Sequence, residues 1–250
     1  EGTVFLRSLL AGAVFLVLAR PSPRMVREPG FHEVLIFGVV LFAMNACFYA
    51  AIDQIPLGAA VTLEFVGPLG LAIIGSHRRR DLIWVALAAA GILLLSDGLG
   101  DGLLSLGAAF ALGSGFFWSL YIVQSARLGK RFAGVTPVAV AIMISAVLGA
   151  PLGIAEGGSE LLDPAAWAVA LAVGLLSTVI PYTLELNALR RIPNAVFGVL
   201  MSLQPAVAAL VGLALLSQGL SATEVLAIGL VVVASAGALR SGSSPPPIET

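Results

Sequence analysis

Long apolar stretches separated by short polar junctions occupy almost the whole chain, and this pattern restricts its fold more than any other feature. A helix needs about 20 apolar residues to cross the hydrocarbon core of a bilayer. Nine stretches reach or approach that length: residues 3–19, 33–52, 57–75, 82–96, 103–126, 135–155, 165–189, 194–216 and 223–239. Because lipid offers the backbone no hydrogen-bond partner, each stretch has to be helical. The sequence therefore predicts an all-α integral membrane protein with nine visible spans.

Composition excludes a water-soluble globular domain. Of the 250 residues, 59% are hydrophobic and 11% are charged, whereas soluble domains carry about a quarter charged residues. The net charge of −1 gives no sign of a nucleic-acid partner. The string Gly98–Asp101 spells the GxGD of aspartyl intramembrane proteases, but no second intramembrane aspartate completes a carboxylate pair. We therefore expect the lipid bilayer as a partner, and no nucleic acid, metal, cofactor or enzymatic activity.

The basic residues alternate between junctions. Twelve of the 13 lysine and arginine residues follow the first, third, fifth, seventh and ninth stretches, whereas the other junctions carry acidic residues such as Asp53, Asp97 and Glu160. By the positive-inside rule, the basic junctions face the cytoplasm. The pattern predicts a multi-pass protein of a bacterial inner membrane, with a disordered cytoplasmic tail at residues 241–250.

Two segments of the chain resemble each other at an offset of 137 residues. Residues 55–72, IPLGAAVTLEFVGPLGLA, align with residues 192–209, IPNAVFGVLMSLQPAVAA. The preceding pair is Asp53–Gln54 in the first segment and Arg190–Arg191 in the second, which places the same turn on opposite sides of the membrane. Such a pattern is typical of an inverted-topology repeat.

The repeat suggests a division of the chain. Residues 1–100 form a first repeat with four helices, and residues 101–240 form a second with five. The stretch 103–126 then has no partner in the first repeat. We expect an inverted-repeat bundle of ten helices whose first helix is absent from this sequence. A natural nine-span protein is the alternative.

Three charged residues lie inside the apolar stretches, away from the first two residues at either end, namely Arg7, Glu64 and Glu185. A charge at the bilayer centre costs about 2.5–3.5 kcal/mol on insertion scales and marks a functional site by default. Glu64 lies roughly 12 Å along its helix, near the midplane. Arg7 lies nearer the outer surface, so it either serves the site or extends its head group to the interface.

Prolines predict helix interruptions beside two of these charges. Pro68 has no amide hydrogen for the carbonyl of Glu64, and Pro205 leaves the carbonyl of Met201 without its partner in the same way. Paired interruptions at equivalent places in two repeats point to the binding site of a transporter. Pro181 is a third candidate interruption, although neighbouring helices can also accommodate such kinks without any functional role.

Polar and aromatic residues complete the candidate site. One face of their predicted helix carries Ser114, Trp118, Tyr121 and Ser125, and Asn45 and Tyr49 form a shorter stripe. The candidate substrate-binding residues are Arg7, Asn45, Tyr49, Glu64, Trp118, Tyr121, Tyr182, Glu185 and Gln204.

Three strings resemble a known family: AVTLEFVGPL, STVIPYTLELNALRRIP and GVLMSLQPAVAAL. They are similar to the EamA branch of the drug/metabolite transporter superfamily, and within it to threonine/homoserine exporters of the RhtA type. The resemblance covers residues 2–240. It implies ten helices in two inverted repeats, a central substrate cavity, and export coupled to protons, with Glu64 and Glu185 among the residues held in common. Gln204 and Gln218 depart from the pattern, because such proteins carry glutamate at these two positions. An amide cannot carry a coupling proton, so the resemblance does not extend to a coupling role for them.

The leading hypothesis from these patterns is a secondary exporter of amino acids or similar small metabolites. In it, Arg7 attracts a carboxylate, and Glu64 with Glu185 faces an ammonium group or carries the coupling proton. Export of cationic or amphipathic compounds is a second hypothesis. A non-transporting membrane scaffold or sensor is a third, although it would need neither a midplane carboxylate nor paired helix breaks.

Overall fold

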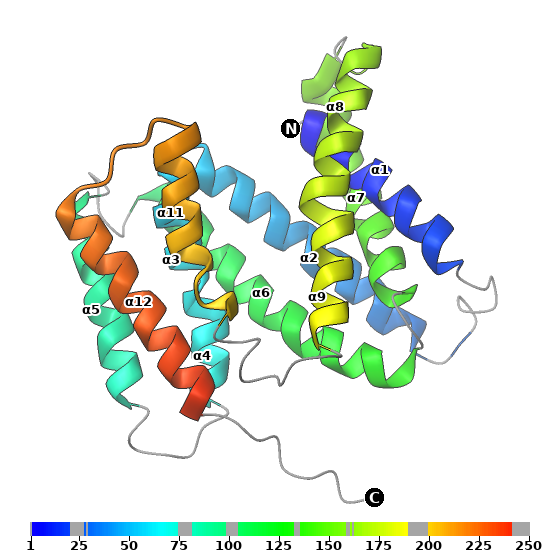
Figure 1. Cartoon of the computed structure of the whole chain (residues 1–250). Coiled ribbons are helices and arrows are strands. Elements are labelled where there is room, and N and C mark those ends of the chain that lie inside the picture. Colours follow the sequence, from blue (N-terminus) through cyan, green and yellow to red (C-terminus); the bar gives the residue numbers. More distant parts are fainter. Residues whose placement is uncertain are drawn as a thin grey trace, which may run out of the picture. The chain divides into compact units, whose positions relative to one another are not determined.

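The fold was analysed in a computed structural model, which describes residues 2–20, 28, 30–74, 82–98, 105–132, 136–158, 161, 163–189 and 200–241 (Figure 1). Every regular element in this part of the chain is a helix. The all-α prediction is therefore confirmed for the described residues.

The helix bounds follow the apolar stretches closely. The elements are α1 (Gly2–Ala19), α2 (Phe31–Ile52), α3 (Leu57–Glu64), α4 (Val66–Ile74), α5 (Leu82–Gly98), α6 (Leu106–Arg131), α7 (Thr136–Gly157), α8 (Pro164–Gly174), the π-helix η5 (Leu175–Val179), α9 (Ile180–Leu189), α11 (Gln204–Leu215) and α12 (Ala222–Ser241). One predicted stretch is divided between α3 and α4, and another runs continuously through α8, η5 and α9.

Four helices in the described part of the chain are long and apolar enough to cross a membrane: residues 31–52, 106–129, 136–155 and 164–184. Shorter apolar helices cover residues 5–19, 57–71, 82–95, 204–215 and 222–238. Large apolar side chains are exposed on many of these helices, for example Val17, Leu82, Leu176 and Leu215. Such a surface suits lipid rather than water.

The chain divides into two compact units. The first comprises Glu1–Ala43 and Leu120–Arg190, and the second comprises Met44–Ser119 and Arg191–Thr250. Within the first unit α1 packs along α7 and α8, and within the second α5 packs along α12 and α3 along α11. Each unit combines segments from both halves of the sequence. The units therefore do not correspond to the expected repeats, and the division into repeats at residues 1–100 and 101–240 stays a prediction.

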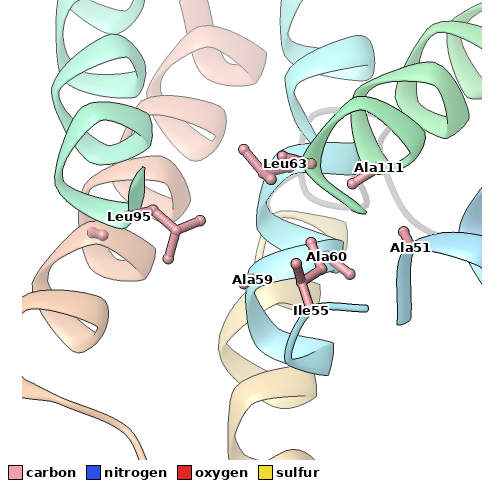
Figure 2. Packing of buried hydrophobic residues seen from close by; sticks show 9 residues of the cluster. Ala51, Ile55, Ala59, Ala60, Leu63, Leu95 and Ala111 are labelled. Atoms are coloured by element: carbon pink, nitrogen blue, oxygen red, sulfur yellow. The ribbon is translucent and has the colours of Figure 1, made fainter. Parts of the chain in front are cut away.

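Small side chains bring the helices of the second unit together. Figure 2 shows Ala59, Ala60 and Leu63 of α3 in a buried cluster with Ala111 of α6 and Leu95 of α5. Alanine and glycine let helix backbones approach closely, which is how helices associate where lipid supplies no hydrophobic driving force. The packing holds the C-terminal end of α3 against α6.

Several of the predicted cytoplasmic segments fall on residues that the structure does not describe. Arg78–Arg80, Arg190–Arg191 and the tail at residues 242–250 lie outside the described residues. The membrane orientation therefore stays a prediction.

Candidate functional site

A break between two helices places Glu64 at the candidate site. Helix α3 ends at Glu64, about one turn before Pro68, and α4 begins at Val66. The regular bonds continue on either side, from the Phe65 amide to the Val61 carbonyl at 3.0 Å and from the Leu69 amide to the Phe65 carbonyl at 3.1 Å. The interruption is thus confined to the turn at Glu64, whose carbonyl would bond to the amide hydrogen that Pro68 lacks.

Two glycines let α6 approach this break. A Cβ atom built on Gly67 would overlap the Gly115 carbonyl, and one built on Gly115 would overlap the Glu64 carbonyl. The backbones of α4 and α6 are therefore in direct contact beside Glu64. Only glycine permits an approach of this kind without displacing a helix.

The Glu64 side chain bonds to a buried serine of α6. Ser114 Oγ lies 2.6 Å from Glu64 Oε1 and 3.0 Å from the Met44 carbonyl oxygen of α2. The Ser114 side chain is fully buried. One turn further along α6, the Trp118 ring contacts Phe65 edge to face, with a centroid distance of 5.1 Å.

A cavity of about 430 Å³ lies beside Glu64 in the second unit. Its walls come from α2, α3, α11 and the turn before α11. The lining residues are Phe48, Leu57, Val61, Glu64, Leu200, Leu203, Gln204, Val207, Ala208 and Val211. Glu64 and Gln204 are the polar members of this otherwise apolar lining.

A second helix break contributes Gln204 to the same cavity. Residues 200 and 201 are helical, residues 202 and 203 form a turn, and α11 begins at Gln204. Pro205 follows at once, as its missing amide hydrogen predicts. At the repeat offset of 137 residues, this break is equivalent to the one beside Glu64. The Gln204 amide contacts Met201 Sδ at 3.6 Å, a weak acceptor that leaves the side chain available for stronger bonds.

Arg7 lies in the first unit, buried against the π-helix. The arginine is 8% exposed, and its Nη1 lies 3.1 Å from Ser177 Oγ and 3.2 Å from Thr178 Oγ1. Both hydroxyls belong to η5, which ends two residues before Pro181. Two hydroxyls thus hold the guanidinium inside the unit, and a role in the site and a head group at the membrane interface both stay predictions. A π-turn within an α-helix is rare and frequent at functional sites.

Two of the candidate tyrosines form an aromatic series in the first unit. Tyr182 lies edge to face with Phe15, at 6.4 Å, and with Tyr121, at 6.3 Å. Tyr121 in turn stacks on Phe37 at 5.2 Å. Their rings pack against other rings, so a structural role explains these contacts as well as a binding role does.

The remaining candidates divide between described and undescribed side chains. Asn45 and Tyr49 are half-buried on α2, where the Tyr49 ring contacts the cavity residue Phe48 edge to face at 6.0 Å. The backbone of Glu185 belongs to α9, but its side chain lies outside the described residues. Within the second unit, the structure thus brings Glu64, Gln204 and Phe48 around one cavity, whereas Asn45 and Tyr49 are not among its lining residues.

Sequence reasoning missed two contacts of the second unit. It singled out Ser114 as part of a polar face without predicting its bond to Glu64. It also missed that Gln218 Oε1 accepts a hydrogen bond from the Leu57 amide at 3.0 Å. This amide belongs to the first turn of α3, whose donors have no partner within the helix. Gln218 therefore caps the helix that carries Glu64.

Comparison with known proteins decides the family. A profile of the EamA-like transporter family matches residues 105–240. The threonine/homoserine exporter RhtA of Escherichia coli (strain K12) is 38% identical over 239 residues, which cover 94% of this chain and 80% of the relative. The chain belongs to the EamA-like transporter family. The predicted resemblance is thereby confirmed, and so is the prediction of a membrane transporter rather than an enzyme.

Other relatives match over similar lengths. The threonine/homoserine exporter RhtA of Salmonella typhimurium (strain LT2) is also 38% identical over 94% of this chain and 80% of its own length. The uncharacterized transporter YwfM of Bacillus subtilis (strain 168) is 28% identical over 91% and 80%. A protein of known crystal structure is similar with a TM-score of 0.63 and 21% identity, over 94% of this chain and 85% of that one. At this identity the likeness concerns the fold alone.

Proposed function

We propose that this EamA-family chain is a secondary exporter of amino acids, with threonine and homoserine as the first candidate substrates, in a bacterial inner membrane. The observation that carries the proposal is a carboxylate, Glu64, at a helix break beside a cavity of about 430 Å³. The identity of 38% with threonine/homoserine exporters over 94% of the chain supports the substrate class.

The cavity chemistry fits part of an amino acid. In the proposal, the Glu64 carboxylate receives the substrate ammonium group, and the apolar walls contact its aliphatic atoms. The amide of Gln204 supplies one donor and one acceptor group for a hydroxyl or a carbonyl. Glu64 is also the proposed carrier of the coupling proton, because Gln204 cannot ionise.

The other candidate residues are proposed to contact the substrate or to supply a second acidic group. Arg7 carries a planar set of donors that suits a carboxylate, and it lies beside the π-helix of the first unit. Glu185 is the second proposed acidic group. Asn45, Tyr49, Trp118, Tyr121 and Tyr182 remain proposed contacts for the substrate.

The proposed architecture is a ten-helix inverted repeat. It is supported by two broken helices, at Glu64–Val66 and before Gln204, that are equivalent at the repeat offset. Broken helices in corresponding positions are typical of secondary transporters, in which they surround the substrate.

One observation favours a second candidate function. Apart from Glu64 and Gln204, the cavity lining is apolar. One carboxylate in an apolar pocket also suits a hydrophobic amine or a quaternary ammonium compound. We therefore keep the export of amphipathic cations as the alternative.

Efflux from preloaded vesicles distinguishes the two functions. Proteoliposomes containing the purified chain would be loaded with labelled threonine, homoserine, leucine or a quaternary ammonium dye, with and without an imposed proton gradient. Gradient-dependent efflux of threonine or homoserine, above that of vesicles containing Glu64→Gln, is the expected result. Efflux of the dye alone would favour the alternative, and efflux of none of the four would contradict both functions.

A further inference from the structure

Ser114 lies between two hydrogen-bond acceptors and has one proton to give. Its hydroxyl oxygen is 2.6 Å from Glu64 Oε1 and 3.0 Å from the Met44 carbonyl oxygen. A serine hydroxyl donates one hydrogen bond, whereas an ionised carboxylate and a backbone carbonyl only accept. The buried Ser114 can therefore serve one of the two acceptors at a time.

The charge of Glu64 decides which of the two acceptors receives the hydrogen bond of the Ser114 hydroxyl. A hydrogen bond from a hydroxyl to an ionised carboxylate typically has an oxygen–oxygen distance of about 2.5–2.7 Å, and it is roughly twice as strong as a hydrogen bond between neutral groups. An ionised Glu64 therefore outcompetes the Met44 carbonyl. A protonated Glu64 becomes a donor itself, so its proton can bond to Ser114 Oγ while the serine proton turns to Met44.

The packing around the break keeps this geometry in place. Ser114 precedes Gly115, whose backbone touches the Glu64 carbonyl, so the spacing between α6 and Glu64 is set by a direct backbone contact. The other polar side chain that lines the cavity is the neutral amide of Gln204 on α11, and the rest of the lining is apolar. Among the described residues that line the cavity, Glu64 is the ionisable one.

Building on the proposed function, we propose that Ser114 is a positioning residue for transport, whose hydroxyl holds the ionised Glu64 carboxylate in the orientation that receives the substrate ammonium group. Without this bond the carboxylate samples other rotamers, so substrate binding weakens. The maximal rate per bound substrate changes less, because Ser114 itself does not contact the substrate.

The experiment compares Ser114→Ala and Ser114→Thr in proteoliposomes, with labelled threonine as the probe. Ser114→Ala should raise the KM of efflux about tenfold, as expected for loss of a hydrogen bond to a charged group, with a change of less than about threefold in maximal rate. Ser114→Thr keeps the hydroxyl and should restore KM to within about threefold of the parent value. An unchanged KM in Ser114→Ala would overturn the assignment.

A double-mutant comparison distinguishes a role of Ser114 in positioning Glu64 from a role in helix packing. It does not depend on Ser114→Thr, whose extra methyl group could disturb the packing. The Kd of labelled threonine would be measured on purified protein, with Ser114→Ala introduced into the parent and into Glu64→Gln. Because the neutral side chain in Glu64→Gln lacks the charge that Ser114 serves, the serine change should alter Kd less than about twofold in that background. Equal effects in both backgrounds would show a merely structural role and overturn the inference.

The same measurements keep the two proposals apart. Near-normal efflux by Glu64→Gln would contradict the role of Glu64 in the proposed function. A strongly impaired Glu64→Gln beside a normal Ser114→Ala would contradict only the assignment of Ser114.

Discussion

Glu64 combines three features on one residue of an apolar helix. It carries a charge within an apolar stretch, it ends α3 at a break in the backbone bonds, and it borders a cavity. Within the part of the chain that the structure describes, its carboxylate accepts a hydrogen bond from the hydroxyl of Ser114 at 2.6 Å. A half-buried carboxylate within an apolar stretch is costly in a membrane and by default marks a functional site.

Replacing Glu64 should impair transport more than replacing Gln204. Glu64→Gln keeps the shape of the side chain and removes its charge, so efflux should fall by about tenfold or more while folding survives. Gln204→Ala should cost less, because that position is already neutral. Initial rates of threonine efflux, normalised to protein in the membrane, test both variants. Near-normal efflux in Glu64→Gln would mean that the carboxylate is structural.

Gln218 should matter for stability rather than for transport chemistry. Its side chain accepts the Leu57 amide at the start of α3, and loss of a helix cap typically costs about 1 kcal/mol. Gln218→Ala should therefore lower the melting temperature in detergent by about 2–4 °C. Gln218→Glu retains the acceptor and places a negative charge near a helix N-terminus, so its melting temperature should equal or exceed that of the parent. Equal melting temperatures for Gln218→Ala and the parent would show that the cap contributes little.

At the scale of elements, the break in α3–α4 and the crossing of α6 depend on each other. The proline leaves a backbone carbonyl without its helical donor, and glycines bring the neighbouring helix against that place. An α-helix in lipid tolerates such an interruption when neighbouring helices cover it. The α6 crossing is therefore part of what makes the charged break stable.

Adding one methyl group at this crossing should separate the helices. In Gly115→Ala the new Cβ would overlap the Glu64 carbonyl, and overpacking of this kind typically costs about 1–3 kcal/mol. Lower thermal stability and a weakened response to Ser114 substitution should follow. Gly70→Ala on α4 is the matched control, because its Cβ meets no atom within 4 Å and alanine favours the helix. If both variants have the melting temperature of the parent protein, the backbones of α4 and α6 are not in direct contact at Gly115.

At the scale of the whole molecule, two contacts agree with the predicted alternation of loops. The Glu33–Arg131 ion pair, at 2.8 Å, joins the start of α2 to the end of α6, and both ends are predicted to be cytoplasmic. The Gln218–Leu57 bond joins the end of α11 to the start of α3, and both ends are predicted to be external. Each contact joins ends that the positive-inside rule assigns to the same side.

Cysteine labelling tests this orientation directly. In a Cys47→Ala background, a single cysteine at position 79 should resist a membrane-impermeant thiol reagent added outside intact cells, whereas one at position 160 should react. Labelling after permeabilisation serves as the control for reactivity. Rapid labelling of position 79 from outside would overturn the orientation.

The sequence by itself determined the helices and the places where they break. The length of each apolar stretch and the missing amide hydrogen of a proline are local properties, so the bounds of α1 and α2 and the breaks beside Glu64 and Gln204 follow from a few adjacent residues. Its charges also pointed to Glu64 as the candidate centre of a site, since a membrane makes each buried charge conspicuous.

Only the tertiary structure decided which helices face each other. The bond from Ser114 to Glu64 spans 50 residues of sequence, and the one from Arg7 to Thr178 spans 171. Helical spacing predicted one shared face for Ser114, Trp118 and Tyr121, whereas the structure places Tyr121 in a different unit from the other two. The physical reason is that helices in lipid are apolar on both their lipid-facing and protein-facing sides, so periodicity cannot reveal the partner of a face. Backbone contacts at glycine and single hydrogen bonds across helices make that choice.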